Sequence, residues 1–304
     1  MQAILETKML EKRYGQFIAV DKINLQIKKN CIYGLVGRNG AGKSSLMRMI
    51  AGLASPTSGT IEFMGERCSR KSDSLKKVGS LIESPALYPN LSGYENLKIK
   101  ALAYGIEQEN HITQILDIVG LDPSSKKNVK GYSLGMKQRL GIGMALVGRP
   151  ELLILDEPIN GLDPRGIIDI RNMLISINEK YRITIIISSH ILEELSKLAT
   201  DFGIMSSGRL IMELSSQELH EQCRSKIEMI CSDAIAASSI LSQQGYVNYT
   251  VLDSKKIIMN DYLEETAKIN TLLVKSGVNV ASIYVKETSF EDFFMEVTRH
   301  EESN

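Results

Sequence analysis

One short segment combines three glycines with a lysine and two serines at the spacing of a phosphate-binding loop, G-x-x-x-x-G-K-[ST]. The glycines let backbone N–H groups turn inward around a β-phosphate, and a helix that begins after the loop adds the positive end of its dipole. Lys43 supplies a mobile cation for the β- and γ-phosphates, and the Ser44 hydroxyl is a ligand for Mg²⁺. The segment therefore predicts a site for the magnesium complex of a nucleoside triphosphate. The residues that we expect to form it are Gly37, Arg38, Asn39, Gly40, Ala41, Gly42, Lys43, Ser44 and Ser45.

Two acidic residues, Asp156 and Glu157, end a continuous apolar run at residues 152–155. Such a run is typical of a strand buried in a parallel sheet, and ligands of open α/β sheets bind at the carboxyl ends of the strands. We expect Asp156 to hold Mg²⁺ there, directly or through water, and Glu157 to polarise an attacking water as general base. The alternative is a solvated Asp-Glu-Pro turn, which the presence of the phosphate-binding loop disfavours.

His190 follows another apolar run, residues 183–187, so the same argument brings it to the rim of the sheet where the two acids are expected. A donor at this place can contact the γ-phosphate and orient the attacking water. We therefore assign His190 a catalytic role together with Glu157. A lone histidine is more often structural or at the surface, and we interpret His111, His220 and His300 in that way because none of them follows such a run.

The elements around these residues indicate an α/β fold, with strands alternating with helices over residues 1–220. Apolar runs at 31–36, 152–155 and 183–187 predict strands of a mainly parallel sheet. The spacing of apolar residues in 44–53 predicts a helix packed on that sheet. From about residue 84 to 150 the pattern becomes helical and predicts a helical subdomain. Its helices are expected at residues 94–104, 111–119 and 134–147.

The order of predicted strands and helices changes after about residue 222, so we expect two domains, 1–222 and 223–304. The order of elements in the second domain is strand, helix, two strands, helix, strand and a last helix, which predicts a small ferredoxin-like α+β domain. The strands are expected at 227–231, 247–252, 256–259 and 280–285, and the helices at 234–243, 263–275 and 290–297.

The composition bears on the possible partners of the chain. Lys plus Arg and Asp plus Glu are both 36, so the zero net charge gives no electrostatic reason to expect nucleic acid as a ligand. None of the four cysteines belongs to a Cys-x-x-Cys pair, so we expect reduced thiols in a cytoplasmic protein. We find no signal peptide, and no apolar run approaches the roughly 18 residues of a membrane-spanning helix. Any role at a membrane is therefore expected to need a partner.

Together these motifs resemble those of the ATP-binding cassette (ABC) transporter ATPases over about residues 3–220. Residues 132–140 resemble the signature segment of that family, and residues 160–163 resemble its D-loop. His190 stands at the position of the family's switch histidine, and Tyr14 where the family has an aromatic ring that stacks on adenine. The resemblance implies a P-loop ATPase core with a mixed, mainly parallel sheet, which binds ATP with Mg²⁺ and hydrolyses it.

The same resemblance implies that two copies face each other head to tail with two ATP molecules between them. Ser133 and Gly135 of one copy would bind the γ-phosphate held by the other at a helix N-terminus. Asp163, in the D-loop, is counted with the nucleotide-binding residues. Because the chain has one set of motifs, it would need a second copy or a related ATPase. A separate transmembrane permease would hold it as a peripheral protein on the inner face of the cell membrane.

Two departures from the family pattern affect this site. The common signature is Leu-Ser-Gly-Gly-Gln. Here Tyr132, Leu134 and Met136 replace the leucine, the first glycine and the glutamine. Because Ser133 and Gly135 are retained, we expect the contact with the other copy's γ-phosphate to work but to be altered. Glu83 stands where the family usually has the Q-loop glutamine. A carboxylate only accepts hydrogen bonds and brings a full charge. We therefore place Glu83 among the ligands of Mg²⁺, with an ordinary surface acid as the alternative.

These departures, with residues 87–92 and 157–164, are similar to one subgroup, the ATPases of bacitracin-resistance and lantibiotic-immunity exporters. The resemblance implies that a separate membrane subunit exports an antimicrobial peptide and so gives immunity or resistance. Alternatives are an exporter ATPase for another substrate and a non-transport ABC protein acting on nucleic acid or ribosomes. A single cassette without heptad repeats disfavours the latter, and the signature-like segment disfavours a nucleotide kinase or GTPase. For four apolar residues two roles stay open: they dock the membrane subunit, or they belong to the core of the helical subdomain. These residues are Leu87, Tyr88, Leu91 and Tyr94.

Overall fold

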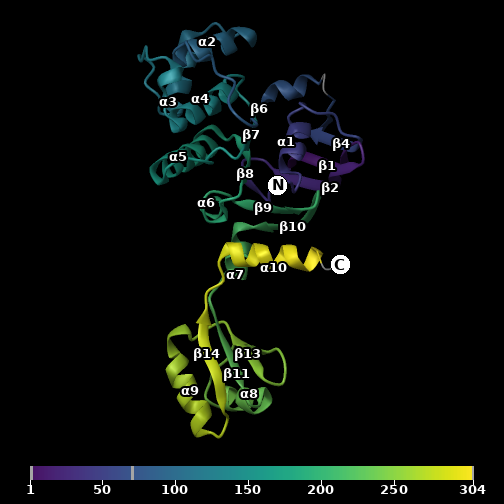
Figure 1. Cartoon of the computed structure of the whole chain (residues 1–304), viewed down its shortest axis with the longest axis vertical. Helices are drawn as coiled ribbons and strands as arrows, with labels where there is room; N and C mark the ends of the chain where they lie inside the picture. Colours follow the sequence, from purple (N-terminus) through teal and green to yellow (C-terminus); the bar gives the residue numbers. More distant parts are fainter. Residues whose placement is uncertain (1–2, 70–71, 303–304) are drawn as a thin grey trace. The chain divides into compact units, whose positions relative to one another are not determined.

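The computed structural model of the protein describes residues 3–69 and 72–302 (Figure 1). The chain divides into two compact units, which adjoin in the sequence between Ser216 and Gln217. The first unit contains two sheets with their helices, and the second contains one sheet with helices of its own.

The larger sheet of the first unit has six strands. They are β3 (Ile32–Val36), β6 (Val78–Leu81), β7 (Leu152–Asp156), β8 (Thr184–Ser189), β9 (Asp201–Ser206) and β10 (Arg209–Ser215). Their order is β10-β9-β3-β8-β7-β6, and all but β10 run parallel. Every residue of β3 and β8 is buried, which explains why their sequences are nearly continuous apolar runs. Parallel pairing brings the carboxyl ends of β3, β7 and β8 to one edge of the sheet.

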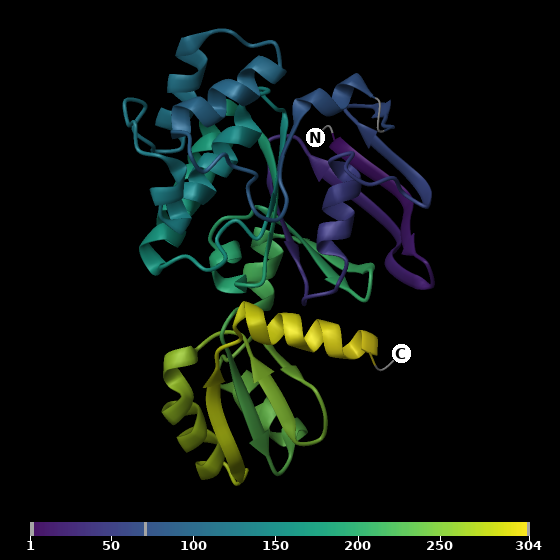
Figure 2. The same cartoon turned by 45° about the horizontal axis from the view of Figure 1, so that its top comes forward.

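A second, antiparallel sheet contains four strands. They are β1 (Ala3–Tyr14), β2 (Phe17–Lys28), β4 (Ser58–Phe63) and β5 (Glu66–Arg67), in the order β2-β1-β4-β5. The helix α1 (Lys43–Ile50) shares one hydrophobic core with both sheets, which includes Leu10, Leu46, Phe63 and Ile186. Figure 2 shows the ribbon of α1 beside the antiparallel sheet.

The predicted alternation of strands and helices begins only at β3. The long hairpin of β1 and β2 precedes it, and the sequence did not predict this hairpin. Register shifts interrupt the pairing of the two strands, between Thr7 and Leu10 among other places. Each shift breaks the period of two by which a half-buried strand is recognised in a sequence.

Three helices of the first unit lie close to their predicted positions: α2 (Gly93–Ala103), α3 (Glu109–Ile118) and α4 (Leu134–Leu146). The sequence did not predict α5 (Pro164–Tyr181), α6 (Leu192–Ser196) or the 3₁₀ helices η1 (Asp73–Lys77) and η2 (Val129–Gly131). A capping box fixes the start of α2: the Ser92 side chain accepts a hydrogen bond from Glu95 N at 3.2 Å, and Ser92 N donates to Glu95 Oε2 at 2.7 Å.

The second unit is built on a four-stranded antiparallel sheet. Its strands are β11 (Lys226–Cys231), β12 (Tyr249–Val251), β13 (Lys256–Met259) and β14 (Val280–Lys286), in the order β12-β13-β11-β14. Its helices are α7 (Ser216–Gln222), α8 (Ala234–Gln243), α9 (Thr266–Lys275) and α10 (Phe290–Glu302), with a 3₁₀ turn η3 (Leu263–Glu265). The βαββαβ order with this arrangement of strands is the predicted ferredoxin-like one.

Glu228, on β11, is a buried acid in this sheet. Its carboxylate accepts hydrogen bonds from Tyr284 at 3.0 Å and Lys286 at 3.1 Å, and Lys256 Nζ lies 3.1 Å away. Desolvation by burial raises the pKa of Glu228, but these hydrogen bonds and charges outweigh it and lower the pKa to about 2. The charged carboxylate therefore stabilises the folded sheet.

We expect Glu228→Gln to destabilise the second unit by up to about 3 kcal/mol at pH 7, because the pKa lies more than two units below that of an unfolded glutamate. The stabilisation that Glu228 gives the folded state is fully present above the pKa of glutamate in the unfolded chain. It is lost as the pH falls from about 4.5 to about 2. Amide hydrogen exchange in β11 should therefore be faster in the variant at pH 7, with no difference near pH 2. The exposed Glu264→Gln is the control, and equal exchange in all three proteins at pH 7 would refute the assignment.

Candidate functional site

The phosphate-binding loop lies between β3, which ends at Val36, and α1, which begins at Lys43. Gly40 and Gly42 have φ angles of 84° and 102°, in the region that favours glycine. A Cβ atom on Gly42 would lie 2.2 Å from the Ala19 carbonyl oxygen. A glycine is therefore required at this position both by the backbone conformation and by the space available.

Lys43 is buried within the loop. Its Nζ donates hydrogen bonds to the carbonyl oxygens of Gly37 at 2.6 Å and Arg38 at 3.2 Å. Desolvation lowers the pKa of Lys43, and the nearby Glu157 and Asp156 carboxylates oppose that shift. The ammonium group therefore stands at the loop, held by neutral carbonyls that a phosphate oxygen can replace.

A pocket of about 230 Å³ brings the loop and the acid pair together. Ser44 and Ser45, at the start of α1, line it with Asp156 and Glu157 at the end of β7. Gly37 and Arg38 do not line the pocket. Its lining residues are Phe17, Ala19, Asn39, Gly40, Ala41, Gly42, Lys43, Ser44, Ser45, Asp156 and Glu157.

The aromatic ring that lines this pocket is Phe17, whereas Tyr14 is absent from the lining. The two residues are register partners at the end of the β1–β2 hairpin, and both are exposed, Tyr14 by 48% and Phe17 by 62%. The Tyr14 ring lies 5.0 Å from Lys12 Nζ instead. The sequence interpretation missed Phe17, although an aromatic residue three positions after Tyr14 was a signal for it.

Ser188, on β8, connects the two acids and was also missed. Its hydroxyl donates to Asp156 Oδ1 at 2.6 Å and accepts from Glu157 N at 3.0 Å. The parallel register pairs Asp156 with Ser188, so a polar residue at the end of the neighbouring strand was the available signal. This contact fixes the Asp156 carboxylate at the rim of the sheet.

His190 and Glu157 lie in direct contact. His190 Nδ1 is 2.7 Å from Glu157 Oε2, and the His190 backbone N–H donates to the same oxygen at 3.4 Å. Glu157 has a positive φ of 51°, which is uncommon for a residue with a side chain. The structure thus brings together the two residues that the sequence predicts to be catalytic.

Glu83 does not line the phosphate pocket with Asp156 and Ser44. Its carboxylate forms an ion pair with Arg48 on α1, and its side chain is 69% exposed. Arg48 therefore balances the extra negative charge that Glu83 brings in place of a glutamine.

Ser133, Gly135 and Asp163 lie apart from the phosphate loop, in a different pocket of about 310 Å³. Ser133 Oγ caps α4 by accepting from Met136 N at 3.3 Å, and Asp163 Oδ1 caps α5 by accepting from Gly166 N at 2.9 Å. The two pockets share no lining residue. One copy of the chain thus presents two separate surfaces, a phosphate loop with its acids and a pair of helix N-termini.

The residues of the phosphate pocket fit a Mg²⁺ ion. The Ser44 hydroxyl and the Asp156 carboxylate are hard oxygen donors, and they line the same pocket as Lys43. A phosphate-binding loop between a buried strand and a helix, with an acid pair at the end of a neighbouring parallel strand, defines a P-loop nucleoside triphosphatase.

The comparisons with known proteins define the family. Residues 20–160 match the sequence model described as ABC transporter. The chain is 43% identical to the bacitracin transport ATP-binding protein BcrA of Bacillus licheniformis, over 98% of both chains. It is 46% identical to the lantibiotic transport ATP-binding protein SrtF of Streptococcus pyogenes, over 69% of this chain and 90% of that protein. The chain belongs to the ATP-binding subunits of ABC transporters, and it is an ATPase.

Solved structures agree with this family. CbiO1 of Clostridium perfringens, described as part of the ABC transporter complex cbiONQ, is 28% identical and has a TM-score of 0.66, over 73% of this chain and 92% of that chain. MJ1267, an ATP-binding cassette of an ABC transporter, shares the fold with a TM-score of 0.67 at 24% identity, over 73% of this chain and 95% of that chain. Among residues 3–69 and 72–302, no helix has the length and apolar character to cross a membrane.

Proposed function

We propose that this chain supplies the energy for a bacterial exporter of an antimicrobial peptide and so gives resistance or immunity. The observation that carries the proposal is the similarity to the bacitracin transport protein of Bacillus licheniformis, which spans 98% of both chains and so includes the second unit as well as the ATPase unit. The similarity to a lantibiotic transport protein, over 69% of this chain, supports the same class of substrate.

In this proposal Mg²⁺ accompanies ATP, held by Ser44 and Asp156. The ion would supply positive charge to the phosphate oxygens. Lys43 binds the same end of the triphosphate, and Glu157 accepts a proton from the attacking water. His190 holds the Glu157 carboxylate in place, which the distance of 2.7 Å between Nδ1 and Oε2 supports. Phe17 or Tyr14 supplies the surface for the adenine ring.

The working form would contain two ATPase subunits, either two copies of this chain or this chain with a relative. The separation of the phosphate pocket from the Ser133–Gly135 surface supports this arrangement, because neither surface surrounds a triphosphate alone. In the dimer the N-terminus of α4 in one copy would face the γ-phosphate bound by the other, with Asp163 beside it.

A separate membrane subunit would dock on the helical part of the first unit and so hold the chain at the inner face of the cell membrane. A pocket of about 290 Å³ there is lined by Leu87 and Gln138, among others. Gln138 Oε1 is buried and has no hydrogen-bond partner among the described residues, so a donor from a partner would satisfy it. Tyr88 is 52% exposed beside Leu87 in the sequence, which suits the docking role over the core role.

The test is a susceptibility panel of bacitracin, lantibiotics and unrelated drugs. Cells with this chain and its membrane subunit should tolerate several-fold more of one peptide antibiotic than cells that carry the Glu157→Gln variant with the same subunit. Protection against unrelated drugs but no peptide antibiotic would contradict the proposed substrate class.

A further inference from the structure

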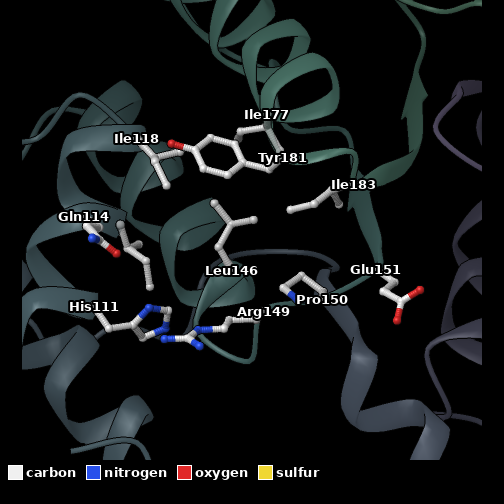
Figure 3. A pocket seen from close by; sticks show the side chains of 11 residues that line it. His111, Gln114, Ile118, Leu146, Arg149, Pro150, Glu151, Ile177, Tyr181 and Ile183 are labelled. Atoms are coloured by element: carbon white, nitrogen blue, oxygen red, sulfur yellow. The ribbon is translucent and has the colours of Figure 1, made fainter. Parts of the chain in front are cut away.

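A cavity of about 400 Å³ lies in the first unit, away from the phosphate loop (Figure 3). Its walls come from α3, the end of α4, the connection between α4 and β7, the last turns of α5 and the residue before β8. Glu151 and Ile183 of the cavity precede β7 and β8, whereas Asp156 and Ser189 end these strands. The cavity therefore belongs to the edge of the sheet opposite the ATP site, and the ATPase mechanism does not use it.

Most of the wall is apolar. Ile115, Leu146, Ile177 and Ile183 are each at least 90% buried, and their side chains line the cavity. Figure 3 shows Tyr181 and Ile118 on one side of it and His111 and Arg149 on the opposite side, with Leu146 between them. The volume lies within the roughly 300–1,000 Å³ of small-molecule sites, which combine apolar walls with a few polar groups. These walls suit a compact apolar body.

The cationic group of the cavity is Arg149. Its Nη2 donates to the neutral Gln108 Oε1 at 3.3 Å, and it forms no ion pair with an acid in the part of the chain that the structure describes. Glu151, the acid of the cavity, is already paired with Lys77 at 2.8 Å. His111 Nε2 bonds to the Val147 carbonyl oxygen at 2.8 Å, which fixes the imidazole as part of the wall. The cavity therefore offers an exposed guanidinium group that forms no ion pair with an acid among the described residues.

We propose that this cavity binds a small carboxylate with an apolar body. The carboxylate lies on the Arg149 guanidinium, whose planar fork matches its two oxygens. The apolar body lies among the isoleucines and Leu146. Since the walls come from the helical part and from the sheet with α5, the ligand joins these two parts of the ATPase unit. Because the cavity and the phosphate pocket share no residue, ATP does not compete with it.

The test uses the full chain with isoleucine methyl groups labelled for NMR, and octanoate as the probe with octanamide as its neutral match. Octanoate should shift the signals of Ile115, Ile118, Ile177 and Ile183 and bind about tenfold more tightly than octanamide, since tenfold equals about 1.4 kcal/mol and charge-assisted hydrogen bonds are worth at least that. Arg149→Gln should abolish this preference. Arg67→Gln, an exposed arginine of β5, should keep it.

Three results of this comparison of octanoate with octanamide would overturn the proposal. They are equal binding of octanoate and octanamide, shifts confined to isoleucines outside the cavity, and an unchanged preference in Arg149→Gln. If the signals of isoleucines far from the cavity are the same in Arg149→Gln as in the unaltered protein, the variant is folded. Ile118→Phe, which fills the cavity, should weaken the binding of both probes, and unaltered binding would place them elsewhere. Saturating ATP should leave the octanoate affinity unchanged, and competition would also count against the proposal.

Discussion

Replacing Glu157 with glutamine should lower ATP hydrolysis by roughly 100- to 10,000-fold, the range expected when a general base is removed. Glutamine has nearly the same size but cannot accept the proton from water. The variant should keep its ATP affinity, because Lys43, Ser44 and the loop are unchanged and one negative charge near the phosphates is lost. Steady-state phosphate release and nucleotide titration measure the two quantities separately.

The control for this variant is Glu66→Gln, which removes an exposed glutamate of β5. Its hydrolysis should match that of the unaltered protein. Near-normal hydrolysis by Glu157→Gln would show that another group accepts the proton. A parallel loss of ATP binding would show instead that the Glu157 side chain maintains the pocket and does not act on water.

Gly135→Asp should lower hydrolysis by more than about 100-fold and leave ATP binding to the single chain intact. The new carboxylate would stand in the first turn of α4, where the γ-phosphate of the partner's ATP is expected, and the two negative charges would repel each other. The phosphate pocket does not include Gly135, so the first binding step is spared. Phosphate release and ATP affinity at low protein concentration check both parts.

The matched control at this position is Gly135→Ala. A Cβ atom there meets only the Leu162 side chain, at 3.8 Å, so the helix accepts it without strain. Most of the hydrolysis should remain. If Gly135→Asp hydrolyses ATP normally, or loses ATP binding as a single chain, the N-terminus of α4 does not act on the partner's nucleotide.

The parts of the site that the sequence predicted are those indicated by a short continuous stretch of residues. The phosphate loop is a continuous segment, and its glycines are required by positive φ angles and by the contact of Gly42 with Ala19 O. The acid pair follows a buried strand, whose apolar run is visible without knowledge of its neighbours. His190 follows such a strand in the same way, and the parallel register brings it to Glu157.

The parts that were missed depend on pairing between distant segments. Ser188 acquires its role only because β8 pairs with β7 in a register that sets it beside Asp156. Arg48 and Glu83 are far apart in the sequence, and no local pattern indicates their ion pair. Tyr14 and Phe17 are register partners on neighbouring strands, and no local pattern in the sequence shows which of the two lines the pocket.

The measurement that tests the central claim most directly is the molecular mass of Glu157→Gln in solution with and without Mg-ATP. The account predicts a chain of 33.8 kDa alone and a dimer of twice that mass with ATP, as measured by sedimentation velocity. Adding Gly135→Asp to the same chain should restore the single-chain mass in ATP. A Glu157→Gln protein that binds ATP and stays a single chain, or a dimer that Gly135→Asp does not disturb, would contradict the claim that two copies share each ATP site.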